Sequence, residues 1–433
     1  MESLPPSVAI VESFAKLESA VHFYNPLSPM NLFLYLVYRL FRLCVLFYEF
    51  LKYYSPIPLY NRCEISRIVL GGRFDYGDTC RDCDFITLHQ SYETLNSLLD
   101  PHWMLYTISK KYAYFVKLPH PVWEYKGDTT PFLVFRLTKE ATHVAKCSLE
   151  DLCFFASMLP DLQGRVIFFA NTARCGSTLL TKTLQSADPR VVSLCEPEAF
   201  TVLSMILDEN VWAPEAFERI LHATVRVYCK NMKESEVYFF KARSNGVRLV
   251  APLKRVLPEV DCIFMFRKSI LSTVKSILRV SINCERYPYR VLNLRKLHPK
   301  LASWITAWAG YESKYFSFIK PKTATQLAFL LYARPYMDFY TYEHLYSLPL
   351  IMYEDFVRSP EKHLRKLFEL CGIEGESSME NALECLKFDS QDGTPLCQKE
   401  AHRLKVELSE EERVDLMKIS EKIGFQAELS DWC

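Results

Sequence analysis

The sequence predicts an α/β fold of three layers around a central, mostly parallel sheet, preceded by a mixed α+β extension. Three observations lead to this prediction. Short apolar runs of strand length recur after residue 160, as at residues 165–170, 237–240 and 260–266. Segments long enough for helices separate these runs, which is the order of parallel β–α units. Several runs end on charged residues, and parallel sheets collect their functional groups at the carboxyl ends of strands.

The composition describes a globular chain that is longer than one average domain. It has 433 residues, of which 49% are hydrophobic and 24% charged, enough for a sizeable core. The formal net charge is +1 at pH 7, so no overall attraction to nucleic acid is expected. An anion site would therefore be a local concentration of Arg and Lys side chains.

We expect four segments along the chain. They are an N-terminal segment (1–28), a hydrophobic helix (29–56), an extension of unknown role (57–160) and a main α/β domain (161–433). The N-terminal segment lacks the basic start and the apolar core of a signal peptide. The chain holds 15 cysteines, mostly inside apolar runs, and no Asn-x-Ser/Thr acceptor, which favours reduced thiols and a cytoplasmic location.

Residues 30–54 form a Leu-, Phe- and Tyr-rich run that is long enough for a bilayer. Arg39, Arg42 and Glu49 fall inside it on one helical stripe. The favourable insertion of the apolar residues and the cost of the two arginines nearly cancel. Three interpretations stay open: a membrane-spanning anchor, a helix packed in protein with its polar stripe facing solvent, and a helix in the membrane interface.

The extension carries no recognisable functional motif. Residues 113–117 and 131–137 read as short strands. A lone C-x-x-C, from Cys80 to Cys83, fits no standard zinc spacing with Cys63 and His89, so we predict no metal site.

The strongest signal is a strand–turn–helix unit at residues 165–186. A buried strand is followed by a turn of small residues (171–178) and by a helix that stops at Asp188-Pro189. This geometry aims several backbone N–H groups and the positive end of a helix at one anion. The alternative is a serine-capped helix with Arg174 on the surface.

The turn differs from a Walker A loop, G-x-x-x-x-G-K-[ST]. Asn171 stands at the first glycine position and Ser177 at the lysine position, while the cation has moved to Arg174. Gly176 lets the backbone close on a ligand, and Thr178 adds a second hydroxyl beside the helix N-terminus.

This order of residues resembles the 5′-phosphosulfate loop of sulfotransferases that use 3′-phosphoadenosine-5′-phosphosulfate (PAPS). The pattern is nearest to protein-tyrosine and Golgi carbohydrate sulfotransferases. The resemblance covers roughly residues 160–395 and implies a P-loop-type fold for residues 161–433, with PAPS as co-substrate. It implies that the loop binds PAPS through Arg174, Cys175, Gly176, Ser177 and Thr178, although Cys175 departs from the usual pattern.

Two further strand ends supply candidate catalytic groups. A second strand, residues 191–194, leads to Glu196, where a carboxylate beside an anion loop is placed to take a proton from an acceptor hydroxyl. The resemblance implies that Glu196 is the base, with Glu198 as the fallback. The strand at residues 237–240 ends on Lys241, which the resemblance implies stabilises the bridging oxygen; Arg243 could share that work.

The remaining candidates bind the nucleotide. Arg267 ends the strand at residues 260–266, and the resemblance implies that it holds the 3′-phosphate together with a serine eight positions on. That position is Lys275, and the serine is Ser276, so Lys275, Ser276 and Arg279 all stay open as partners. The resemblance further implies Tyr353 near the adenine, and a closing loop that carries Gln391 and Gly393.

The sequence therefore predicts a sulfotransferase that moves a sulfuryl group from PAPS to a hydroxyl or amine by in-line displacement, without a metal. Arg174, Lys241 and Glu196 are the expected catalytic residues. A silent PAPS- or nucleotide-binding protein, a P-loop kinase or hydrolase, and a membrane-associated scaffold are the alternatives. The acceptor stays open among sugar, protein tyrosine, lipid and small alcohol, and a type II Golgi membrane protein is the alternative location.

Overall fold

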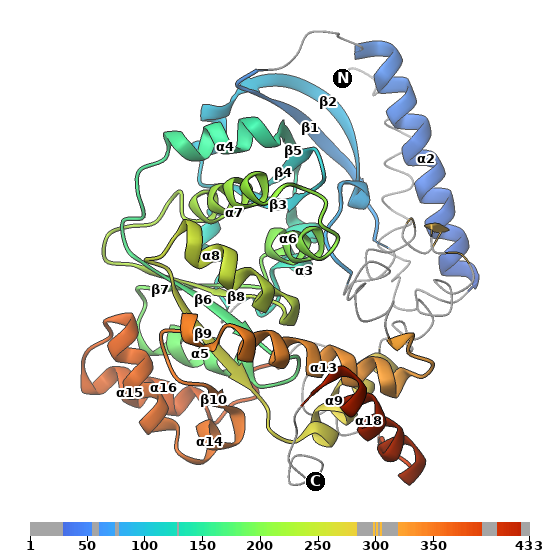
Figure 1. Ribbon diagram of the computed structural model, residues 1–433. Helices are drawn as coiled ribbons and strands as arrows, with labels where there is room; N and C mark the ends of the chain where they lie inside the picture. Colours follow the sequence, from blue (N-terminus) through green and yellow to red (C-terminus); the bar gives the residue numbers. More distant parts are fainter. Residues whose placement is uncertain are drawn as a thin grey trace.

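The computed structural model describes residues 29–53, 60–73, 78–127, 130–283, 298, 300–301, 304, 319–391 and 405–425. Within this part of the chain, two five-stranded sheets form the frame. Figure 1 shows the sheet of the N-terminal half in blue and cyan, with the second sheet (β6–β10) beyond the helices that separate them.

The second sheet is parallel throughout, in the order β10-β9-β6-β8-β7. Its carboxyl ends therefore meet along one edge, which confirms the predicted parallel α/β fold. The strands are β6 (Arg165–Asn171), β7 (Val191–Cys195), β8 (Val237–Lys241), β9 (Asp261–Phe266) and β10 (Ile351–Met352).

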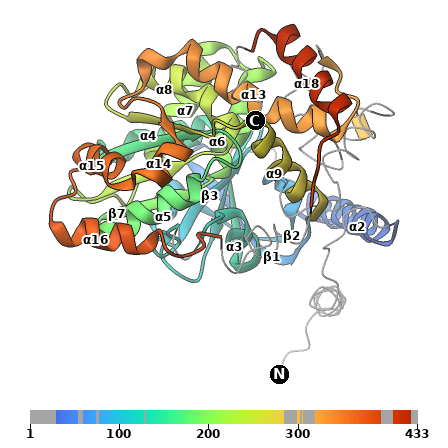
Figure 2. The same cartoon turned by 90° about the horizontal axis from the view of Figure 1, so that it is seen from below.

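Alternating side chains of β6 divide the core into two layers. Ile167 and Phe169 belong to one buried cluster, whereas Phe168 and Ala170 belong to another. One layer contains α5 (Ser177–Ala187), α14 (Tyr353–Arg358), α15 (Pro360–Cys371) and α16 (Glu376–Cys385). Figure 2 shows α16 beside α5. The central sheet is thus covered on both faces, as the three-layer prediction requires.

The opposite layer contains α6 (Glu198–Asp208), α7 (Pro214–Tyr228), α8 (Val250–Val256), α9 (Ile270–Asn283) and α13 (Ala324–Thr341). The last described helix, α18 (Glu410–Ile423), packs on α13. Ser409 and Glu412 form a reciprocal capping box at its start. Short 3₁₀ turns are η1 (Asp82–Asp84), η2 (Leu95–Leu99), η3 (Val122–Glu124), η4 (Ser244–Leu249) and η6 (Glu343–Leu345).

The N-terminal sheet is antiparallel, in the order β2-β1-β5-β4-β3. Its strands are β1 (Arg62–Gly71), β2 (Phe85–Thr94), β3 (Trp103–Ile108), β4 (Tyr112–Lys117) and β5 (His143–Ser148), with α4 (Leu149–Met158) after them. The strand predicted at residues 113–117 is confirmed as β4.

The strand predicted at residues 131–137 is wrong, because this segment begins the helix α3 (Leu133–Glu140). Leu133, Val134 and Leu137 are buried at helical spacing. Arg136 and Glu140, four positions apart, form an ion pair of 2.8 Å on the other side. In a short run with so many apolar residues, the helical and the strand spacing of apolar positions cannot be told apart, which explains the error.

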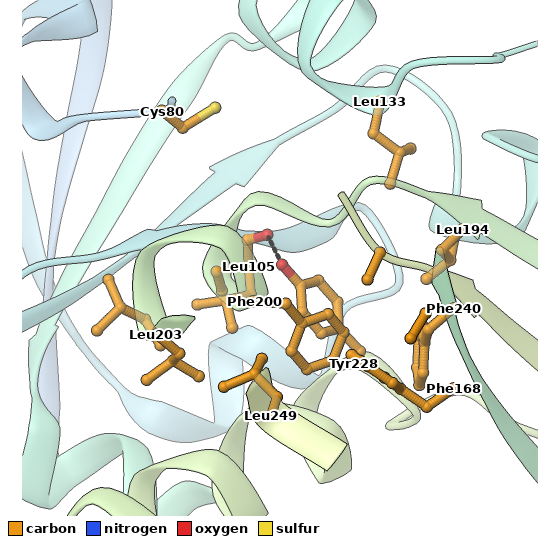
Figure 3. Packing of buried hydrophobic residues seen from close by; sticks show 14 of the residues in the cluster. Cys80, Leu105, Leu133, Phe168, Leu194, Phe200, Leu203, Tyr228, Phe240 and Leu249 are labelled. Atoms are coloured by element: carbon orange, nitrogen blue, oxygen red, sulfur yellow. Dashed lines mark hydrogen bonds between the residues drawn. The ribbon is translucent and has the colours of Figure 1, made fainter. Parts of the chain in front are cut away.

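The N-terminal sheet shares a core with the helices of the parallel sheet. Phe200 on α6 and Tyr228 on α7 pack with tilted rings whose centroids lie 5.3 Å apart. The hydroxyl of Tyr228 donates to the backbone oxygen of Leu105 on β3 at 3.2 Å (Figure 3). One continuous apolar cluster therefore runs from β3 to the strands β6 and β8.

The hydrophobic helix α2 (Pro29–Tyr53) lies along β2 (Figure 1). Arg42 donates to the backbone oxygen of Phe85 at 3.1 Å, and Glu49 accepts from the backbone N–H of His89 at 2.8 Å. The polar stripe therefore faces protein, and the interpretation in which it faces solvent is wrong. The reason is that β2 is an edge strand among the described strands, and the outward backbone groups of such a strand need hydrogen-bond partners.

The side chains on the outer face of α2 are apolar. Leu40 is 62% exposed and Phe47 64% exposed, and the other large apolar side chains exposed on this helix are Met30, Phe33, Leu43, Leu46, Tyr48, Phe50 and Leu51. Among the described helices, none combines the length and the apolarity needed to cross a bilayer.

Candidate active site

The backbone of the loop between β6 and α5 is left-handed at two residues, Gly176 and Arg174. Gly176 has φ +84°, and a Cβ on it would lie 2.5 Å from Cδ2 of Tyr353. Arg174 has φ +62°, in the left-handed region that a non-glycine residue seldom adopts. Such strain collects at functional sites. The loop therefore presents Arg174 and the first N–H groups of α5 at the carboxyl edge of the parallel sheet.

Arg174 brings three separate segments together. Its Nε donates to Oγ of Ser276 on α9 at 3.0 Å, and its Nη1 donates to Oε1 of Gln391 at 3.1 Å. Burial lowers the pKa of Arg174, and the nearby positive charge of Arg267 lowers it further. Two guanidinium groups that approach closely enough to repel each other are suited to an anion between them.

Arg267 follows β9 and extends over the ring of Tyr353, with its guanidinium carbon 5.3 Å from the ring centroid. Its Nε is 3.8 Å from Oε1 of Glu354. Tyr353, the first residue of α14, thus lies between Gly176 and Arg267. These residues join the ends of β6, β9 and β10.

The three open positions on α9 differ in direction. Ser276 contacts the loop through Arg174, whereas Lys275 pairs with Glu407 at 2.8 Å. The hydrogen bond from Lys275 lowers the pKa of Glu407, and the charge of Arg279 contributes to the same shift. Ser276 is therefore the position of the three that faces the loop directly.

Lys241 joins the loop to the end of β8. Its side chain is 1% exposed, and Nζ lies 3.0 Å from Oγ1 of Thr178 and 3.0 Å from Oε1 of Glu196. Nζ is also 5.0 Å from the ring centroid of Phe132. A buried ammonium group thus contacts the start of α5, a carboxylate and an aromatic ring from the N-terminal half.

Glu196 has φ +60° and directly follows β7. Its backbone N–H donates to the oxygen of Lys241 at 2.7 Å. Its second carboxylate oxygen is 3.3 Å from Nε of Arg243, whose Nη2 is 2.6 Å from Glu198. The carboxylate of Glu196 is thus held between two cations at the edge where the loop ends.

Two loop residues have plainer roles. The Cys175 thiol is fully buried, and burial raises its pKa to about 11, which makes it a small apolar side chain and no ready nucleophile. Ser177 is the first residue of α5, and its backbone oxygen accepts from Thr181 at 2.8 Å.

The sequence-predicted residues fall into two connected groups at this edge. Around the loop lie Arg174, Gly176, Arg267, Ser276, Tyr353 and Gln391, and beside them lie Thr178, Glu196 and Lys241. Gly393 lies outside the described residues. Sequence reasoning missed Phe132, Glu354 and the pairing of Glu198 with Arg243, and no motif marked the segment that carries Phe132.

The candidate zinc residues have other partners. Cys63 is 3.9 Å from the oxygen of Thr94, and His89 is 3.5 Å from Glu64. In the part of the chain that the structure describes, no group of three or more His, Cys, Asp or Glu side chains is arranged to hold a metal ion.

No protein-family model matches the chain, and no curated protein matches it. Solved structures similar to it include sulfotransferases. The sulfotransferase domain of the Synechococcus PCC 7002 olefin synthase is 14% identical, with 62% of this chain and 98% of that chain covered and a TM-score of 0.31. A sulfotransferase from Alicyclobacillus acidocaldarius is 15% identical (61% and 97% covered, TM-score 0.34). The sulfotransferase domain of the curacin biosynthetic pathway is 14% identical (61% and 99% covered, TM-score 0.32).

Proposed function

We propose that the chain is a PAPS-dependent sulfotransferase that transfers a sulfuryl group to a hydroxyl or amine acceptor. The observation that carries the proposal is the contact of Arg174 with Ser276, beside Arg267. It joins the loop cation and the two groups expected for the 3′-phosphate. An adenosine bisphosphate offers two anionic ends, and paired cationic segments at neighbouring strand ends suit that ligand.

In this proposal the loop binds the 5′-phosphosulfate through Arg174 and the N–H groups from Cys175 to Thr178. Arg267 and Ser276 hold the 3′-phosphate, and Arg279 adds positive charge on the same helix. Tyr353 borders the adenine, while Gln391, which accepts from Arg174, lies beside the nucleotide.

The proposed chemistry is an in-line displacement at sulfur. Glu196 takes the proton of the acceptor, whose oxygen or nitrogen forms the new bond to sulfur. The bond from sulfur to the bridging phosphate oxygen breaks, and its electron pair leaves with the phosphate. Lys241 neutralises that oxygen, and Arg174 neutralises the equatorial oxygens. These cations supply the charge that a metal supplies in many phosphoryl transfers.

The test uses PAPS with a labelled sulfuryl group and an extract as the source of acceptors. Wild type is expected to label a product, and Glu196→Ala is expected to lose about 10²- to 10⁴-fold in rate, the usual contribution of a general base. Glu361→Ala, which removes an exposed glutamate of α15, is the matched control. Equal labelling by wild type and Glu196→Ala would remove Glu196 from the mechanism.

A silent PAPS- or nucleotide-binding protein is the second candidate, and one observation favours it. Glu196 is held by both Lys241 and Arg243, so an acceptor must compete with two cations for the base. Calorimetry with adenosine 3′,5′-bisphosphate (PAP) tests whether the chain has a nucleotide site at all, since both candidate functions require that PAP binds. Binding of PAP without turnover of PAPS would favour the silent protein.

Membrane association through residues 30–54 is a further part of the proposal. The support is the apolar outer face of α2, whose polar stripe is occupied by contacts to the N-terminal sheet. A helix of this kind lies in the membrane interface and leaves the rest of the protein on one side.

A further inference from the structure

Glu198 connects the candidate active site to the N-terminal sheet. Its side chain is 1% exposed, and its two oxygens have different partners. Oε1 lies 2.6 Å from Nη2 of Arg243, and Oε2 accepts from the backbone N–H of Cys80 at 3.2 Å. Burial raises the pKa of Glu198, while the positive charges of Arg243 and Arg73 act in the opposite direction. A carboxylate so enclosed cannot reach an acceptor, which argues against its use as the fallback base.

Arg243 bridges two carboxylates with one guanidinium group. Its Nε is 3.3 Å from Glu196, and its Nη2 is 2.6 Å from Glu198. The planar fork of arginine can hold two carboxylates in fixed directions, whereas the single ammonium of lysine cannot. The orientation of Glu196 therefore depends on a group that Glu198 holds in place.

The Cys80 amide is itself fixed by the N-terminal sheet. Thr107 on β3 donates from its hydroxyl to the backbone oxygen of Cys80 at 2.8 Å. Arg73, two residues after β1, donates to the Cys80 thiol at 3.4 Å and lies 3.7 Å from Asp84. The N–H that holds Glu198 is thus part of a buried segment whose hydrogen bonds lead to the N-terminal sheet.

We infer that the N-terminal sheet is a working part of the active site, in which Glu198 and Arg243 are positioning residues that orient the Glu196 carboxylate. The inference rests on the proposed function. Without Glu198, Arg243 keeps Glu196 as its carboxylate partner in this cluster and draws it away from the acceptor. The N-terminal sheet then acts through the chain Thr107, Cys80, Glu198, Arg243 and Glu196.

The first experiment compares Glu198→Gln and Arg243→Lys with wild type in the release of PAP from PAPS, with water or an extract as acceptor. We expect kcat to fall about 10- to 100-fold in both variants, the range for losing a group that orients a reacting side chain. The KM for PAPS and the Kd for PAP should stay within about twofold of the wild-type values, because the substitutions leave the ground-state binding of the nucleotide unchanged. Arg243→Lys keeps the charge, so full activity in this variant would show that charge alone matters and would overturn the inference.

Asp188→Asn is the matched control for Glu198→Gln. Asp188 precedes β7, its side chain is 9% exposed, and it pairs with Arg190 at 2.6 Å. This substitution neutralises a similarly paired carboxylate at the opposite end of the strand, so kcat should equal that of wild type. Equal losses in Asp188→Asn and Glu198→Gln would indicate a general effect on folding and would overturn the positioning role.

The second experiment tests the N-terminal link. Thr107→Val removes the hydroxyl that fixes Cys80, while Thr142→Val removes an exposed hydroxyl–carbonyl bond to Lys117 in the same sheet. Thr107→Val is expected to lower kcat several-fold, and Thr142→Val to leave it unchanged. Equal rates in these two variants would show that the N-terminal sheet does not contribute to catalysis.

A third readout does not depend on PAPS. Amide hydrogen exchange in the peptide that contains Cys80 should be faster in Glu198→Gln than in wild type, because the N–H loses a charged acceptor. Unchanged exchange would refute the link itself. A wild-type protein that neither binds PAP nor turns over PAPS would instead refute the proposed function, and with it the catalytic role of the link.

Discussion

Arg174 and Ser276 are 102 positions apart in the chain, yet Nε of one donates to Oγ of the other at 3.0 Å. The contact connects the loop after β6 to α9, the helix that follows Arg267. A ligand anion at the loop therefore also experiences the groups at the end of β9. We therefore expect nucleotide affinity to depend on Ser276 rather than on the neighbouring Lys275.

Ser276→Ala should weaken PAP binding by about 10-fold or more, since one charge-assisted hydrogen bond contributes about 1.5–3 kcal/mol. Lys275→Ala removes a larger side chain one position away, but that side chain pairs with Glu407. Its effect on PAP binding should be small. Calorimetric titration of both variants with PAP is the measurement, and a larger loss in Lys275→Ala would assign the phosphate to lysine.

Gly176→Ala should both destabilise the protein and abolish PAP binding. The left-handed backbone costs an alanine about 1–2 kcal/mol, and the new Cβ would also meet the Tyr353 ring at 2.5 Å. Gly424→Ala is the matched control, because Gly424 has φ +71° and no heavy atom within 4 Å of an added Cβ. Urea unfolding should show the backbone cost in both variants, and loss of PAP binding in Gly176→Ala. Normal PAP affinity in that variant would mean that the loop does not hold the nucleotide.

The parallel sheet could be predicted because each of its longer strands is a continuous apolar run that ends on a charged or polar residue. Local sequence also sufficed for the capping box at Ser409, where two side chains three positions apart decide the helix start. It did not decide between Lys275 and Ser276. Adjacent helical residues point about 100° apart, so the phase of α9 against the loop selects one of them.

The contributions of the N-terminal half could not be predicted. Phe132 approaches Lys241, and the Cys80 amide approaches Glu198, through packing between residues that are more than 100 positions apart. Backbone amides leave no mark in a sequence, and an aromatic residue in an apolar run is ordinary core material. The outward apolar face of α2 was likewise hidden, because its orientation depends on the outer edge of β2.

The outer face of α2 should bind lipid surfaces. Leu43→Gln combined with Phe47→Gln is expected to reduce co-sedimentation with vesicles of phosphatidylcholine and phosphatidylserine at least about tenfold, since each buried large apolar side chain contributes about 1.5–3 kcal/mol. Phe154→Gln with Met158→Gln is the matched control, because both residues are exposed apolar side chains on α4. Equal sedimentation of the two double variants would argue against α2 as the contact.

Lys230 should make stability depend on pH above neutrality. It follows α7 and donates to the backbone oxygens of Leu98 and Asp100, the latter at 2.9 Å. Burial lowers its pKa from 10.5 to about 7, and the charge of Asp100 opposes this only in part. Between about pH 7 and pH 10.5 the unfolded chain therefore binds more protons at this residue than the folded chain, so its contribution to the free energy of unfolding rises with pH in this window.

Comparing wild type with Lys230→Met isolates that contribution, because the other titrating groups are common to both proteins. The free energy of unfolding, measured in urea at pH 7 and pH 9, should rise more between the two pH values in wild type than in Lys230→Met, by an amount on the order of 1–3 kcal/mol. Lys233→Met, at a side chain that is 77% exposed, should behave like wild type. An equal rise in wild type and Lys230→Met would mean that Lys230 stays charged in the folded protein, with its ammonium group satisfied by the two carbonyl oxygens that it contacts.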